Sequence, residues 1–121
     1  MQKKVFAIGL DPDCADFSGL QNITPELVRV YIHSQLERVR AAGYAVDEYL
    51  IRPGINDGDS LADAMQAGHY DCIMIGAGRR ANEHIVLFEK TLNLAHRYQP
   101  RAKICFNTSP ADTLEAVQRW M

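Results

Sequence analysis

The sequence predicts an α/β domain: a four-stranded parallel sheet with helices on both faces, as a three-layer sandwich. The main observation is that short apolar runs alternate four times with segments of helical periodicity. A second observation is that the first and third apolar runs are stronger than the second, so we place those two strands in the middle, in the order 2-1-3-4. The length of 121 residues suits a single domain, residues 1–121.

The predicted strands are nearly continuous apolar runs, which is typical of strands covered on both faces. The second run is followed by Arg52, Pro53 and Gly54, where proline cannot donate to the ladder and glycine permits a turn. The runs are 5–10 (VFAIGL), 45–51 (AVDEYLI), 70–75 (YDCIMI) and 102–106 (AKICF).

The first predicted helix has clear signals at both ends. Thr24 is an N-cap residue with Pro25 at the first helical position, and Gly43 ends the helix. Its apolar side chains share one side of the wheel, which predicts an amphipathic helix lying on the sheet. These side chains are Val28, Ile32, Leu36 and Val39.

Three further helices follow the later strands. Asp59 or Ser60 can cap a short second helix, and residues 82–98 have the period of a long third helix. Ser109 with Pro110 opens the last helix as N-cap and first helical residue.

The composition excludes several classes of protein. Apolar residues make up 47% and charged residues 23%, as in soluble globular proteins. The formal charge of −2 argues against a nucleic-acid binder. The N-terminus has basic residues and then only a short apolar stretch, so we expect a cytoplasmic protein without a signal peptide or membrane span.

A candidate binding site lies where the predicted strand order reverses. In open α/β sheets, ligands bind beyond the carboxyl ends of the strands at this point. Gly76 and Gly78, directly after the third strand, allow close backbone approach, and Arg79 or Arg80 could clamp an anion. The alternative is a structural turn whose arginines pair with acids or water. Since adjacent arginines cannot easily face one ligand, we expect one at the site and the other in solvent.

Acidic residues follow the first strand, on the other side of the same crevice. Asp11, Asp13 and Asp16 stand in a position that in many α/β enzymes holds a metal or a nucleophile. With the arginines, they could hold Mg²⁺ and a phosphorylated ligand. Pro12 instead favours a simple turn, and we assign no metal.

Two further residues are candidates for chemistry. Cys14, in the same loop, would be a nucleophile if a nearby cation lowered its pKa, but residues 15–22 lack the arginine of a phosphate-binding thiol loop. His84, in the first turn of the third helix, could serve as a neutral acid or base, or only cap the helix. Cys72 and Cys105 fall in predicted strands and are expected to be small core residues.

Polar residues also end the fourth strand. Asn107 and Thr108 reach the same rim and are candidates for contacting a ligand, whereas Ser109 is most simply a helix cap.

The third predicted helix carries more apolar surface than is required to cover one face of the sheet. Besides the stripe that would cover the sheet, Leu87, Leu94 and Tyr98 form a second stripe. We expect this stripe to be buried in a twofold dimer, unless a neighbouring helix or Trp120 covers it.

The stretch IMIGAGRRANEHIVLFEKTLNLAHRYQPRAKICFNTSPADTLEAVQRW resembles the C-terminal half of a family of short, mostly uncharacterised bacterial proteins with a Rossmann-like or flavodoxin-like domain. The similarity is best over residues 70–120, and its most specific parts are IGAGRR and FNTSP. The resemblance implies a fold and no established activity.

The layout is also similar to two signalling and transport folds. The B subunits of sugar phosphotransferase systems carry a phosphorylated cysteine directly after strand one, where this chain has Asp11 and only later Cys14. Receiver domains share the acidic loop that Asp11 and Asp13 could match, but they need an acceptor aspartate where Gly76 stands and a fifth strand with a lysine. Phosphoacceptor function is therefore not expected.

Two hypotheses follow from the sequence. The first is a domain that binds a phosphate- or carboxylate-bearing small molecule at the carboxyl edge of the sheet, with acid–base or transfer chemistry if it is an enzyme. The second is a non-catalytic dimeric module that acts through protein contacts. No reaction and no cofactor is assigned.

Overall fold

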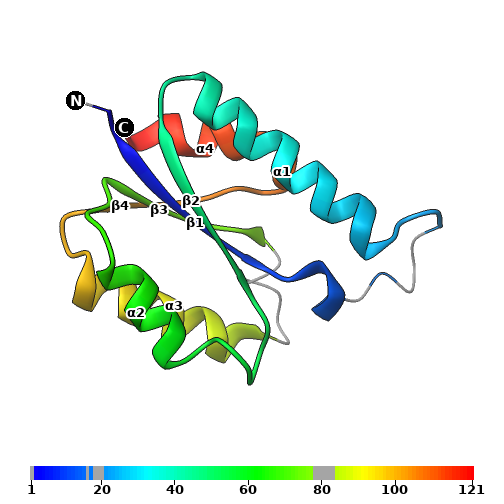
Figure 1. Ribbon diagram of the computed structural model, residues 1–121, viewed down its shortest axis with the longest axis horizontal. Helices are drawn as coiled ribbons and strands as arrows, with labels where there is room; N and C mark the ends of the chain where they lie inside the picture. The colour runs from blue at the N-terminus through cyan, green and yellow to red at the C-terminus, as the bar shows by residue number, and fades with distance from the viewer. Residues whose placement is uncertain (1, 16, 18–20, 78–83) are drawn as a thin grey trace.

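The structure is a computed structural model that describes residues 2–15, 17, 21–77 and 84–121. Its centre is one parallel sheet in the order β2-β1-β3-β4, as predicted (Figure 1). The strands are β1 (Lys4–Leu10), β2 (Ala45–Ile51), β3 (Cys72–Ile75) and β4 (Lys103–Phe106). The last two strands are one or two residues shorter than the apolar runs that predicted them.

The strand order explains the apolar strength of each run. β1 pairs with β2 and β3, so that Ala7 lies opposite Glu48 on one side and Met74 on the other. All four residues of β3 are buried, whereas the edge strand β2 leaves Asp47 exposed. The weaker second run is therefore an edge strand, as expected.

Four α-helices follow the strands: α1 (Pro25–Ala41), α2 (Asp59–Gln66), α3 (Ile85–Tyr98) and α4 (Thr113–Trp120). The predicted caps hold at α1, where the Thr24 hydroxyl accepts from the backbone N–H of Leu27.

Two helix starts differ from the prediction. The N-cap of α2 is Gly58, so Asp59 is already the first helical residue and its carboxylate lies in the first turn. The last helix begins as a 3-10 turn, Pro110–Asp112, before α4. Ser109 caps this turn as predicted, in a capping box with Asp112.

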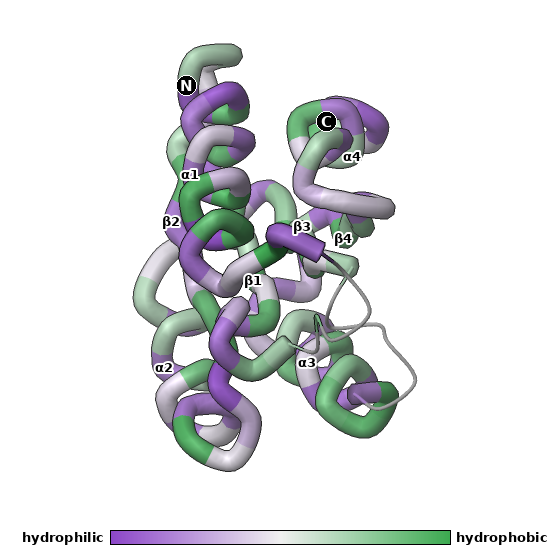
Figure 2. The backbone as a smooth tube through the Cα atoms, turned by 90° about the vertical axis from the view of Figure 1, so that its right-hand side faces the viewer, coloured by the Kyte–Doolittle hydropathy of each residue, from purple (hydrophilic) through white to green (hydrophobic). Residues whose placement is uncertain are grey.

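The helices cover both faces of the sheet. Figure 2, turned by 90° from Figure 1, keeps α1 and α4 on one side of the strands and α2 and α3 on the other. Each pair closes its own core, because successive strand residues point to opposite faces. The first core includes Leu36 of α1 and Val117 of α4, and the second includes Leu61 of α2 and Ala95 of α3.

The second apolar stripe of α3 is covered within the chain. Leu87, Leu94 and Tyr98 are half-buried and pack against the core that contains Leu61 and Met65 of α2. The neighbouring helix thus accounts for the surplus apolar surface. The second stripe therefore no longer supports the predicted dimer.

Two further predictions concern burial. Cys72 and Cys105 are buried as expected, with their sulfur atoms 3.4 Å apart. Among the helices of the described residues, none combines the length and the apolar character that crossing a membrane requires.

Candidate functional site

The predicted crevice lies between the carboxyl ends of β1 and β3. The chain leaves β1 toward α1 on one face and leaves β3 toward α3 on the other, so this is where the strand order reverses. Gly76 continues β3 along β1, because its backbone N–H donates to the carbonyl of Ile8 at 2.8 Å. A Cβ at Gly76 would lie 3.4 Å from the Ile8 carbonyl oxygen, which is an ordinary van der Waals contact.

A pocket of about 220 Å³ opens at this edge, between α1 and the sheet. Its origin is in the sequence of β1, whose side chains toward α1 become smaller along the strand. Val5 fills the core, Ala7 follows, and Gly9 has no side chain at all. The space that larger residues would fill is left open at the carboxyl edge.

The opposite wall of the pocket is the apolar face of α1. Val28, Ile32 and Leu36 line it at helical spacing; Leu36 is buried, whereas Ile32 and Val28 are half-buried. Leu50 of β2 and Met74 of β3 add apolar side chains from the sheet. The described wall is therefore largely apolar.

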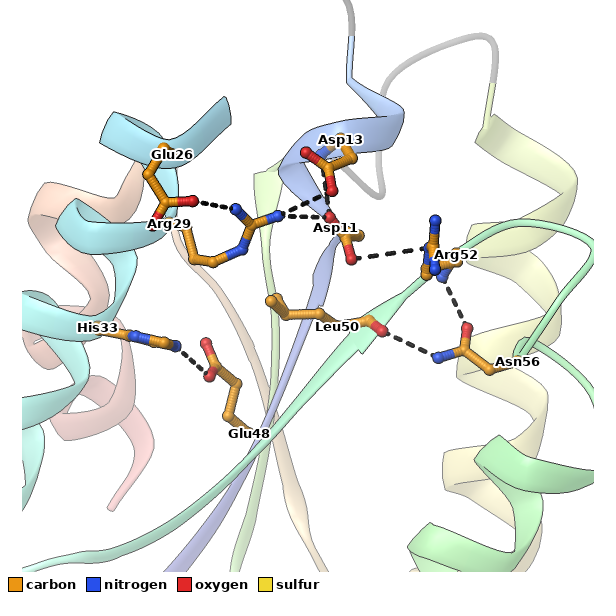
Figure 3. Close-up of polar contacts among 9 residues, drawn as sticks. All are labelled: Asp11, Asp13, Glu26, Arg29, His33, Glu48, Leu50, Arg52 and Asn56. Atoms are coloured by element: carbon orange, nitrogen blue, oxygen red, sulfur yellow. Dashed lines mark hydrogen bonds and ion pairs between the residues drawn. The ribbon is translucent and has the colours of Figure 1, made fainter. Parts of the chain in front are cut away.

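Glu48 is the one charged residue among the described residues that line the pocket. It lies on β2 between Val46 and Leu50 in the alternation that faces α1, and its side chain is only 20% exposed. Oε1 lies 2.7 Å from Nε2 of His33 on α1 (Figure 3). Oε2 is buried and has no hydrogen-bond partner in the described part of the chain.

Asp11 and Asp13 form an ion-pair cluster with Arg29 of α1 beside this pocket (Figure 3). Nη2 of Arg29 lies 3.0 Å from Asp11 Oδ1 and 3.2 Å from Asp13 Oδ2, while Nη1 donates to Glu26 at 2.8 Å. Burial alone would lower the pKa of Arg29, but the hydrogen bonds to Asp13 and Asp11 raise it. Arg52 reaches the other oxygen of Asp11 at 3.9 Å. Asp11, one of the residues predicted to lie near any chemistry, is thus already paired with arginine.

Asn107 and Thr108 lie on the same rim but are engaged within the chain. Asn107 is buried; its Oδ1 accepts from the N–H of Ala77 at 2.9 Å, and its Nδ2 donates to Thr113 at 3.0 Å. It therefore ties the end of β3 to the start of α4, and it also lines the pocket. The Thr108 hydroxyl donates to Asp112, and this hydrogen bond holds the pKa of Asp112 below its ordinary value. A ligand at Thr108 would compete with Asp112.

His84 and Cys14 do not join this pocket. His84 lines a separate depression on the α3 side of the sheet, together with Asp57 and Lys90. Cys14 is half-exposed in the 3-10 turn Pro12–Cys14, while the described lining of the pocket takes in Pro12 from that turn.

Several predicted site residues lie outside the described residues: Gly78, Arg79, Arg80 and Asp16. Within the described ranges, no group of three histidine, cysteine or acidic side chains is arranged to hold a metal ion.

Sequence reasoning missed Arg29, His33 and Glu48. The sequence signals above do not single out His33, and they judge β2 only by its apolar content. The signal that could have found Glu48 is its position: an acid two residues from Val46 and from Leu50 must share their face of the strand.

Neither family models nor curated proteins match this chain. The resemblance to short bacterial Rossmann-like proteins therefore stays a prediction, while the α/β sheet that it implies is present.

Proposed function

We propose that this chain binds a compact small molecule in the pocket between α1 and the carboxyl edge of β1 and β3. The observation that carries the proposal is the position of the pocket. A largely apolar hollow of about 220 Å³ lies where the strand order reverses, which is where α/β sheets bind ligands.

The composition of the wall also supports binding of a small molecule. Ligand pockets are mainly apolar and hold a few placed polar groups that orient the ligand. Here Glu48 and the amide of Asn107 supply such groups within an otherwise apolar surface.

We further propose that the ligand carries a phosphate or carboxylate. Support for this part comes from the sequence: Gly78, Arg79 and Arg80 follow directly on Gly76 and Ala77, which line the pocket. Among the described residues that line the pocket, no arginine or lysine is present, so this part depends on Arg79 and Arg80.

A thermal-shift screen against compact aromatic and aliphatic compounds, nucleotides, sugar phosphates and free phosphate tests both parts. A ligand at a hundredfold excess over its Kd stabilises the folded chain by about 2.7 kcal/mol. Ala7→Leu, which fills the floor of the pocket, should abolish the shift, and Arg79→Ala with Arg80→Ala should weaken it only for anionic compounds. A hit that Ala7→Leu leaves unchanged would place the ligand elsewhere.

A further inference from the structure

Glu48 lines the pocket, and one of its carboxylate oxygens is buried without a matching donor among the described residues. Its Oε2 has no hydrogen-bond partner in the described part of the chain, although Oε1 is engaged by His33 at 2.7 Å. Figure 3 shows the side chain between β2 and α1, with only one of its oxygens in a polar contact. A carboxylate only accepts hydrogen bonds, and each of its oxygens can take more than one.

An unmatched buried acceptor is costly, and native proteins leave few of them. Each one calls for an explanation, such as strain, catalysis, or a water, ion or ligand that supplies the donor. We propose that the ligand of this pocket carries a protonated amine, attached to a compact apolar body, and that the amine donates to the carboxylate of Glu48. This inference rests on the proposed function and names the end of the ligand that enters the pocket.

The charges around Glu48 favour an amine over an anion at this end. Glu48 is the one charged residue among the described lining residues. The nearby Arg29 is engaged by Asp11, Asp13 and Glu26, so it does not offset the charge of Glu48. A ligand carboxylate beside Glu48 would face a like charge at short range, whereas an ammonium group would form a charge-assisted hydrogen bond. A single ligand can carry this amine and an anionic group at its other end.

The volume and the apolar surface of the pocket limit the size of the ligand's apolar part. An apolar cavity of about 150 Å³ is enough to bind benzene, and this pocket measures about 220 Å³. The space therefore suits one ring or branched alkyl group and a chain of one or two carbons. Ile32, Leu50 and Met74 supply the apolar contacts.

Three probes with the same ring and nearly the same length test the inference: phenethylamine, phenethyl alcohol and phenylacetate. Their Kd values would be measured at neutral pH by following the methyl resonance of Met74, which lines the pocket. We expect the amine to bind at least about fivefold more tightly than either other probe, since charge-assisted hydrogen bonds contribute roughly twice as much as neutral ones.

Two substitutions test whether Glu48 causes the preference for the amine. Glu48→Gln should remove the advantage of the amine, because an amide keeps the shape but loses the charge. The matched control is Glu37→Gln on α1, which removes the same charge from an exposed side chain paired with Arg40 and should leave all three Kd values unchanged.

The possible failures are distinct. If the alcohol or the acid binds as tightly as the amine, or if Glu48→Gln leaves the order of affinities unchanged, the amine inference is wrong while the pocket remains a binding site. If none of the three probes moves the Met74 resonance, the amine inference is wrong, whereas the proposed function is contradicted only if the thermal-shift screen also finds no compound that stabilises the chain.

Discussion

The guanidinium of Arg29 on α1 lies 3.0 Å from Oδ1 of Asp11, the first residue after β1. The same oxygen accepts the backbone N–H of Asp13 at 2.9 Å. This ion pair joins α1 to the turn that borders the pocket, and the Asp11 side chain within it is only 15% exposed.

Arg29→Met should therefore destabilise the chain, because Arg52, at 3.9 Å, is then the one cationic partner of Asp11 among the described residues. The melting temperature should fall further than for Arg101→Met, a control at an exposed position. Since salt screens the partly exposed ion pairs, the gap between the two variants should narrow at high ionic strength. Equal melting temperatures would mean that the cluster adds nothing to stability.

The pH dependence of the free energy of unfolding at acid pH tests a second polar pair, Tyr70 and Asp47. The Tyr70 hydroxyl donates to Asp47 at 2.8 Å and, together with Lys4, holds the pKa of this carboxyl below 3.8, the ordinary value for aspartate. A depressed folded-state pKa gives stability that is fully present above the unfolded-state value and is lost as the pH falls through the folded-state value.

Tyr70→Phe should accordingly make the free energy of unfolding less steeply dependent on pH below about pH 4, while lowering it at neutral pH. Tyr44→Phe is the control, because Tyr44 is a half-buried tyrosine beside the other core. Urea unfolding between pH 2 and pH 7 gives the measurement. An unchanged pH dependence at acid pH in Tyr70→Phe would contradict this role of the hydroxyl.

Glu48→Met should not destabilise the ligand-free chain and should stabilise it by up to about 1 kcal/mol. The substitution removes the unmatched Oε2, whereas His33, whose side chain is 55% exposed, can exchange its lost contact for water. Chemical denaturation of the variant beside the parent chain measures the difference. A clear loss of stability would show that the contact with His33 stabilises the chain by more than the unpaired Oε2 destabilises it.

Gly9→Ala tests why the pocket is open. A methyl group there would meet Leu50 at 3.5 Å, an ordinary contact, and glycine within a strand costs about 0.5–1 kcal/mol relative to alanine. We expect a gain in stability together with weaker binding of any ligand in the smaller pocket. Gly54→Ala is the contrasting variant: it should destabilise, because the φ of Gly54 is +78°.

The fold was predictable because its determinants are local. The apolar runs, the Thr24 and Ser109 caps and the edge character of β2 are each visible within a few residues, and the sheet order follows from the relative apolar strength of β1 and β3.

The candidate site was less predictable because its contacts join distant segments. His33 and Glu48 are 15 residues apart, and only the packing of α1 over β2 brings them together. Arg29 meets Asp11 in the same way, over 18 residues. The glycines and acids at the strand ends located the crevice, but they gave no sign of an apolar wall with one carboxylate in it.

Methionine methyl NMR tests the central claim, small-molecule binding in this pocket, most directly. Met74 lines the pocket, whereas Met65 is buried in the core on the opposite face of the sheet. Titrating the compounds that stabilise the chain in the thermal-shift screen should move the Met74 resonance and leave Met65 in place. Binding that shifts Met65 but not Met74, or a screen in which no compound stabilises the chain, would contradict the claim.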